Sequence, residues 1–242
     1  MHIAIDIGNT QIKTGIFEED VLIRRVSFPT SAMSDTLKEL CAQYKVDKGI
    51  LSHVSRLDSE QILGIGDEVK LLLLDKNTKV PFENLYSTPD TLGVDRIALA
   101  AAAVAKFPDE PVLVIDAGTC ITYDFVNAKR QYEGGSISPG IAMRYKAVHS
   151  FTANLPLLDP ENEIPAQGDS TVRAIHRGIL SGVTYELEGA IEEYKSKNEN
   201  LTVVLTGGDA NFLSNNIKST IFATPNFLLD GLNSILIHNL AE

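Results

Sequence analysis

A short pattern that occurs once in each half of the chain constrains the fold most strongly. Near the start, Ile3-Ala-Ile leads into Asp6-Ile-Gly-Asn-Thr10, and near the middle Val112-Leu-Val-Ile leads into Asp116-Ala-Gly-Thr119. In both copies an apolar run ends in a carboxylate and a glycine turn, and alternating apolar and polar residues follow. This order predicts two strands joined by a tight turn. The chain therefore carries two copies of one structural unit.

Further elements follow each copy in a similar order. The pattern predicts third strands over 21–28 and 131–138, helices over 34–44, 91–105, 171–195 and 227–240, and buried strands over 49–54, 69–74 and 201–205. Two such units indicate an α/β fold with two duplicated lobes, each a mixed central sheet flanked by helices. Two prolines bracket a turn at 107–111, which places the boundary between an N-terminal lobe, 1–108, and a C-terminal lobe, 109–242.

Composition bounds the class of protein. The 242 residues are 44% hydrophobic and 22% charged, an ordinary balance for a globular chain. The net charge of -11 repels nucleic-acid phosphates and anionic membranes, so we expect neither as a partner. Only two cysteines are present, and no apolar run approaches the roughly 20 residues that span a bilayer. We expect a soluble, cytoplasmic protein.

The first glycine turn has the chemistry of a phosphate site. Asp6 ends a buried strand, where its carboxylate can hold Mg²⁺ directly or through water. Gly8 lets the backbone approach phosphate oxygens, and further donors come from Asn9, Thr10 and Lys13. An ordinary hairpin turn would explain this segment equally well, because Gly-Asn turns are common.

The second copy favours the functional interpretation. Two carboxylates that end equivalent strands of duplicated lobes, Asp6 and Asp116, are expected to face one another across a cleft. A third glycine turn, Leu205-Thr-Gly-Gly-Asp-Ala210, would allow close approach of a flat ligand such as adenine or ribose. The three turns together predict a nucleotide site.

Gly93-Val-Asp-Arg96 lies between the two copies, at the start of the predicted alanine-rich helix over 91–105. Backbone N–H groups and the helix dipole favour an anion there. Taken alone, Asp95 would be a carboxylate that stabilises the dipole and Arg96 a surface ion-pairing residue. The flanking phosphate turns favour a substrate site instead.

The order of these four motifs resembles the type III pantothenate kinase family, within the acetate and sugar kinase/actin superfamily. Further matches are 134–140, 152–156 and 168–178, so the resemblance runs from residue 6 to residue 232. The Gly-X-Asp-Arg element between the two phosphate turns is its most specific part.

The resemblance implies two duplicated ribonuclease H-like (actin-like ATPase) lobes and a kinase that uses ATP. In that family the terminal hydroxyl of pantothenate is phosphorylated, which opens coenzyme A synthesis. The resemblance also implies a homodimer that requires Mg²⁺ together with K⁺ or NH₄⁺.

Site residues follow from the resemblance by position. Asp95 would be the proton acceptor for the pantothenate hydroxyl, and Asp116 would ligate the monovalent cation. Asp6 would also lie near the Mg²⁺ carried by ATP. The other substrate-binding residues would be Tyr86, Gly93, Val94, Arg96 and Thr171, and the ATP-binding residues would be Asp6, Ile7, Gly8, Asn9, Thr10, Gln11, Ile12, Lys13 and Thr119.

The chain departs from the family pattern at one position, and two other functions remain as alternatives. The family usually has alanine where this chain has Cys120, whose small thiol we interpret as a packing group. The chain could be another small-molecule kinase of the same superfamily, but Gly93–Arg96 and the short chain argue against a sugar kinase. It could also be a non-catalytic accessory regulator, against which the intact Asp6, Asp95 and Asp116 argue.

Overall fold

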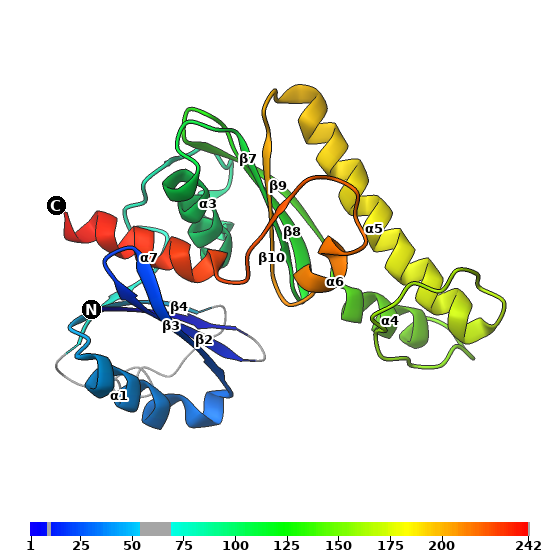
Figure 1. The fold of residues 1–242 in the computed structure, drawn as a ribbon, viewed down its shortest axis with the longest axis horizontal. Coiled ribbons are helices and arrows are strands. Elements are labelled where there is room, and N and C mark those ends of the chain that lie inside the picture. Colours follow the sequence, from blue (N-terminus) through cyan, green and yellow to red (C-terminus); the bar gives the residue numbers. More distant parts are fainter. Residues whose placement is uncertain (9–10, 54–68, 242) are drawn as a thin grey trace. The chain divides into compact units, whose positions relative to one another are not determined.

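The computed structural model describes residues 1–8, 11–53 and 69–241 and divides the chain into two compact units (Figure 1). Unit 1 comprises Met1–Pro108, Arg130–Glu133 and Asn226–Glu242, and unit 2 comprises Asp109–Lys129 and Gly134–Pro225. The units differ from the expected lobes, 1–108 and 109–242, in two segments: the C-terminal helix and a short piece around 131 group with the N-terminal residues.

A mixed five-stranded sheet forms the centre of unit 1, in the order β3-β2-β1-β4-β5. β1, β2 and β3 form an antiparallel meander, whereas β4 and β5 continue the sheet parallel to β1. Alternation along β1 places Ile3, Ile5 and Ile7 on one face and Asp6 on the other. The strands are β1 His2–Ile7, β2 Ile12–Glu18, β3 Val21–Phe28, β4 Lys48–His53 and β5 Lys70–Leu73.

Helices cover both faces of this sheet (Figure 1). α1, Met33–Tyr44, packs Leu37 and Leu40 against the isoleucine face of β1. α3, Val94–Lys106, and α7, Phe227–Leu240, cover the other face and pack against one another. Short 3₁₀ turns over Thr30–Ala32 and Pro89–Thr91 precede α1 and α3, so α3 begins three residues later than the pattern predicts.

Unit 2 repeats the meander. In its sheet β7 pairs antiparallel with β8 and parallel with β10, in the order β11-β10-β7-β8-β9, and β6 joins beyond β9. β6 pairs only with the first residues of β9, which belong to unit 1. The strands are β6 Glu83–Asn84, β7 Val112–Ala117, β8 Cys120–Val126, β9 Gln131–Pro139, β10 Thr202–Thr206 and β11 Phe222–Ala223.

Three helices complete unit 2: α4 Ile141–Ser150, α5 Thr171–Lys197 and α6 Ala210–Ser214. The N-cap residue of the long α5 is Ser170, whose Oγ accepts a hydrogen bond from the backbone N–H of Arg173 at 3.3 Å. Leu180, Val183, Leu187 and Ile191 recur at helical spacing and pack into the core with β7 and β8.

The predicted α/β fold with two mixed sheets flanked by helices is confirmed. Both repeats fold as a strand, a glycine turn and an antiparallel strand, β1–β2 and β7–β8. Among the helices of the described residues, none is long and apolar enough to cross a membrane.

Candidate functional site

The end of β1 brings three polar side chains together in unit 1. The strand register places Asp6 opposite Lys13 on β2 and Ser52 on β4. Ser52 Oγ donates a hydrogen bond to Asp6 Oδ1 at 2.9 Å, and both side chains are buried. The turn that follows is closed by Gly8 N–H, which donates to the carbonyl of Gln11 at 3.2 Å. Asn9 and Thr10, which were predicted to contact phosphates, lie outside the described residues.

Burial dominates the electrostatics of Asp6. Burial raises the pKa of this carboxyl group; the Ser52 hydrogen bond and the charge of Lys13 lower it, and the charge of Asp95 raises it again. The folded state therefore holds the Asp6 proton to a higher pH than the unfolded state. The stabilisation of the folded state by this bound proton is lost as the pH rises through the raised pKa. The ionised Asp6 carboxylate therefore lowers the free energy of unfolding of the ligand-free protein.

Asp95 belongs to the same cluster, since its charge acts on Asp6. It lies in the first turn of α3, where its Oδ1 accepts a hydrogen bond from the backbone N–H of Arg96 at 2.9 Å. A Cβ atom at Gly93 would lie 2.4 Å from Asp95 Oδ1. Only glycine at position 93 therefore leaves room for the carboxylate in this position.

Arg96, the next residue on α3, is 4% exposed. Its Cζ lies 5.6 Å from the centroid of the Tyr86 ring and 6.0 Å from that of Tyr132. Guanidinium groups are attracted to ring faces at this range. Unit 1 thus holds the Arg96 guanidinium between two tyrosines, while the backbone N–H of the same residue binds the Asp95 carboxylate.

Unit 2 gathers three glycine turns around Asp116, at the end of β7. The register pairs Asp116 with Thr206 on β10, just before Gly207. Gly207 has a φ of 99°, and a Cβ there would lie 2.4 Å from Asp116 Oδ1. A Cβ at Gly140 would lie 2.4 Å from the carbonyl oxygen of Thr119, to which Gly140 N–H donates at 3.1 Å. Close backbone approach therefore explains these glycines.

The predicted site residues are thus divided between the two units. Unit 1 holds the cluster of Asp6, Lys13 and Asp95, and it also holds Tyr86 beside Arg96. Unit 2 holds Asp116, Thr119 and, at the first residue of α5, the exposed Thr171. That Asp6 and Asp116 face one another stays a prediction. Cys120 is a free thiol whose Sγ lies 4.0 Å from Met143 Sδ.

Two contributors were missed from the sequence. Ser52 could have been found as a polar residue that ends a buried strand run, as Asp6 does. Tyr132 gave no comparable signal, because it lies 36 residues beyond Arg96 and reaches it only through the pairing of β6 with β9.

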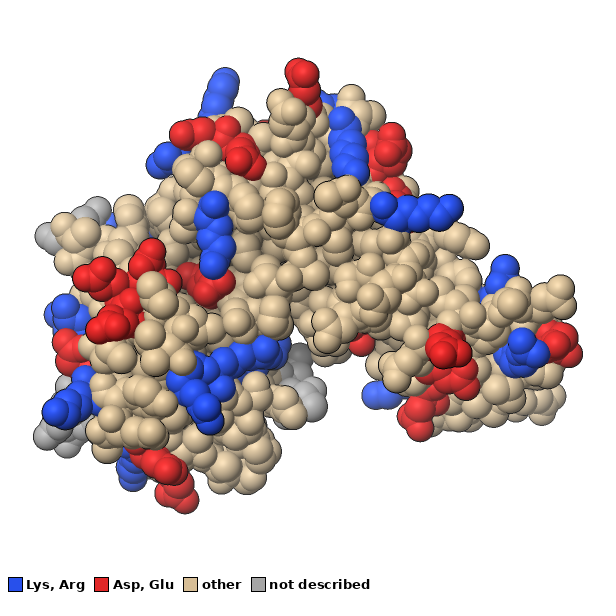
Figure 2. Space-filling model, viewed as in Figure 1, with Lys and Arg blue, Asp and Glu red and all other residues tan. Residues whose placement is uncertain are grey.

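The charged side chains of the protein are mixed in sign, so binding of an anion would depend on individual cationic side chains. On the face seen in Figure 2, Lys and Arg side chains are interspersed with Asp and Glu. With a net charge of -11, a broad attractive field for an anionic substrate is not expected. Recognition would depend on cations such as Arg96 and Lys13.

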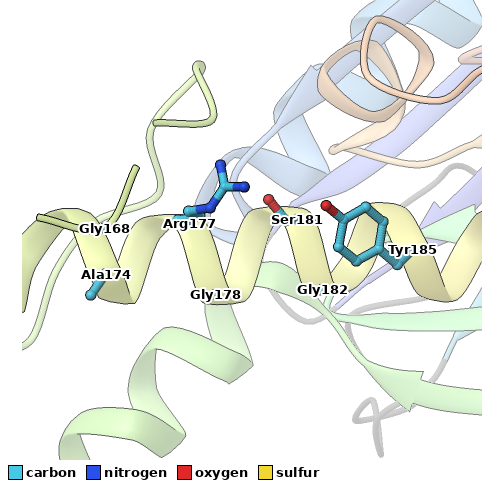
Figure 3. A pocket seen from close by; sticks show the side chains of 7 residues that line it. All are labelled: Gly168, Ala174, Arg177, Gly178, Ser181, Gly182 and Tyr185. Atoms are coloured by element: carbon cyan, nitrogen blue, oxygen red, sulfur yellow. The ribbon is translucent and has the colours of Figure 1, made fainter. Parts of the chain in front are cut away.

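One side of α5 carries a cavity of about 410 Å³. Arg177, Ser181 and Tyr185 point to the same side of the helix, and Gly178 and Gly182 leave space beside them (Figure 3). None of the predicted site residues that the structure describes lines this cavity.

The described residues contain no group of three or more His, Cys, Asp or Glu side chains that could hold a metal ion. The buried Asp6 carboxylate, with Asp95 near it, fits as an oxygen ligand of a divalent cation, because a cation would offset the cost of ionisation there.

Comparisons with known proteins agree on one family. The profile described as type III pantothenate kinase matches residues 2–193. A type III pantothenate kinase of Christiangramia forsetii is 47% identical over 99% of this chain and 99% of its own length. A type III pantothenate kinase of Bacteroides fragilis is 43% identical over 99% of this chain and 98% of its own length.

Solved structures extend the likeness in fold. A Campylobacter jejuni protein, described as a Baf family transcriptional activator, has a TM-score of 0.66 at 22% identity and covers 99% of this chain and 100% of its own. A ROK hexokinase from Thermus thermophilus has a TM-score of 0.54 at 14% identity, covering 99% and 98%. At these identities the likeness concerns the fold alone.

Proposed function

Since the chain belongs to the type III pantothenate kinase family, we propose that it transfers the γ-phosphoryl group of ATP to pantothenate with Asp95 as the proton acceptor. The reaction is the first step of coenzyme A synthesis. The observation that carries the role of Asp95 is the place of its carboxylate in the first turn of α3, where the backbone N–H of Arg96 binds it and its charge acts on Asp6. We also propose that the enzyme works in the cytoplasm.

Asp95 suits the acceptor side of the reaction. Phosphoryl transfer needs little covalent chemistry from the protein beyond orienting the attacking hydroxyl and offsetting charge on the phosphates. A carboxylate in the first turn of α3, with Gly93 leaving it room, can accept the proton of the incoming hydroxyl. The backbone N–H of Arg96 fixes one oxygen of the carboxylate and leaves the other for the substrate.

Arg96 suits the other end of pantothenate. Its guanidinium can form paired hydrogen bonds to a carboxylate, which a lysine could not match. Tyr86 lies beside this guanidinium and would contact the same part of the substrate. Gly93, Val94 and Thr171 complete the proposed substrate set.

We propose that residues 6–13 hold the phosphates of ATP. Thr119 is a further proposed ATP-binding residue. Mg²⁺, when bound with ATP, supplies charge neutralisation on the phosphates, and Asp6 is the residue that would hold it. Asp116 would ligate K⁺ or NH₄⁺, and the close-packed turns at Gly140 and Gly207 would fix its carboxylate.

A homodimer is proposed on the exposed side of α5. Tyr185 is 68% exposed on this side, where it lines the cavity together with Gly178 and Gly182. Gly178 and Gly182, one turn apart, leave open space into which a second helix could pack.

One preparation tests the reaction, the cation and the dimer together. We expect ADP release that depends on pantothenate, rises when K⁺ or NH₄⁺ replaces Na⁺, and is absent with glucose or acetate as acceptor. Sedimentation should give about twice the 26.3 kDa chain mass. Turnover with another acceptor but not with pantothenate would contradict the proposal, as would a single-chain mass for the dimer.

Replacing Asp6 with asparagine should raise stability and lower activity together. The amide keeps an acceptor for Ser52 but removes the buried charge, so Tm of the ligand-free protein should rise at neutral pH. The gain should shrink as the pH falls through the raised pKa of Asp6, since the wild-type carboxyl is then neutral too. We expect kcat/KM for Mg-ATP to fall by about 10–100-fold.

Thermal melts between pH 4 and pH 8, together with ATP kinetics, check this prediction. Asp35→Asn, at an exposed position in the first turn of α1, is the matched control and should change neither quantity appreciably. A lower Tm for the Asp6 variant at neutral pH would show that its carboxylate is a structural ion instead.

A further inference from the structure

Tyr132 is fully buried and is brought to the substrate cluster by strand pairing. It lies in β9, where the register places it opposite Asn84 of β6. Its carbonyl accepts a hydrogen bond from the backbone N–H of Leu85 at 2.9 Å. The pairing ends at Leu85, directly before Tyr86, and places the two tyrosine rings with their centroids 6.1 Å apart.

The two rings hold one cation. Arg96 Cζ lies 5.6 Å from the Tyr86 centroid and 6.0 Å from the Tyr132 centroid. Phe82 packs against the Tyr132 ring, with the ring centroids 6.0 Å apart. Arg96 is 4% exposed, so its side chain has lost most of its water, which makes ring faces energetically significant partners.

We propose that Tyr132 is a positioning residue for pantothenate binding, acting through Arg96. This rests on the proposed role of Arg96 as the partner of the pantothenate carboxylate. Arginine has many rotamers, and a ligand that must order its side chain on binding loses affinity to the entropy of that ordering. The two rings impose it beforehand, so substrate affinity is gained without a direct contact between Tyr132 and pantothenate.

The ring and not the hydroxyl carries this role. Attraction of a cation to an aromatic face depends on the ring quadrupole, which phenylalanine retains and leucine lacks. Tyr132→Phe should therefore keep KM for pantothenate within about twofold of wild type, whereas Tyr132→Leu should raise it by about 2–30-fold. KM for ATP and kcat should change little, because Asp95 and the phosphate turns are untouched.

A double-mutant cycle decides whether Tyr132 acts through Arg96. In an Arg96→Met background, Tyr132→Leu should have no further effect on KM for pantothenate, since the cation it positions is absent. An equal effect in both backgrounds, or a parallel loss in kcat and in KM for ATP, would overturn the proposal. If Arg96→Met alone leaves KM for pantothenate unchanged, the role of Arg96 fails, whatever Tyr132 does.

Phe82→Leu is the matched control. It removes an aromatic ring from the same buried cluster. The Phe82 ring packs against the Tyr132 ring but is not one of the two rings that hold the Arg96 guanidinium. It should lower Tm as Tyr132→Leu does but leave KM for pantothenate within about twofold. If Tyr132→Leu does not fold, Tyr132→Met, closer in volume, replaces it in every arm of the cycle, with the same expected and contrary results.

Discussion

Changing Asp95 to asparagine should lower kcat with pantothenate by about 10²–10⁴-fold, the range that a positioned proton acceptor contributes. The amide oxygen can still accept the hydrogen bond from the backbone N–H of Arg96, so the first turn of α3 should keep its structure. It cannot take a proton from the substrate hydroxyl. The loss should therefore appear in kcat, while the dissociation constant for Mg-ATP, measured by calorimetry, stays within about twofold.

Asp90→Asn is the control for this loss. Asp90 lies in the 3₁₀ turn just before α3 and forms an exposed ion pair with Lys76 at 2.8 Å. Such a pair contributes little to stability, so kcat and Tm should both stay near the wild-type values. An Asp95→Asn enzyme within twofold of wild type would contradict the proton-acceptor role. A loss shared by Asp90→Asn would point to damage at the start of α3 instead.

The repeated turns were predictable because neighbouring residues in the sequence determine them. A period-two apolar pattern and a glycine turn define a hairpin within about fifteen residues, and the registers of β1–β2 and β7–β8 confirm both hairpins. The start of α3 was less predictable. Thr91 has no helical period of its own, and the structure places it in a 3₁₀ turn that ends before Gly93.

Contacts between distant segments were not predictable from the pattern. Ser52 meets Asp6 because β4 returns parallel to β1 after α1, and only the register of that return aligns the two residues. Tyr132 meets Arg96 because β9 pairs with β6. In each case the residue type can be read from the sequence. Its contact partner depends on how a distant strand connects and pairs, which the local apolar pattern does not reveal.

The packing of α7 on α3 is a third such contact, and it leads to the largest expected change in stability. A Cβ at Gly231 would lie 1.8 Å from the carbonyl oxygen of Ala98 and 3.2 Å from the Cβ of Ala102. Alanine in a helix interior gains about 1 kcal/mol over glycine in propensity. A methyl group in that position would force the helices apart, and overpacking of this kind costs about 1–3 kcal/mol and occasionally more.

The clash should win, because the methyl group meets backbone and not the end of a flexible side chain. Gly231→Ala should therefore lower the free energy of unfolding by about 2 kcal/mol, or roughly 4–8 °C in Tm. It should also reduce kcat, since α3 carries Asp95 and Arg96 in its first turn. Gly189→Ala on α5 is the same substitution at a position where the added Cβ meets nothing within 4 Å, and it should raise Tm slightly. If both variants raise Tm, helix propensity and not the contact between α3 and α7 governs position 231.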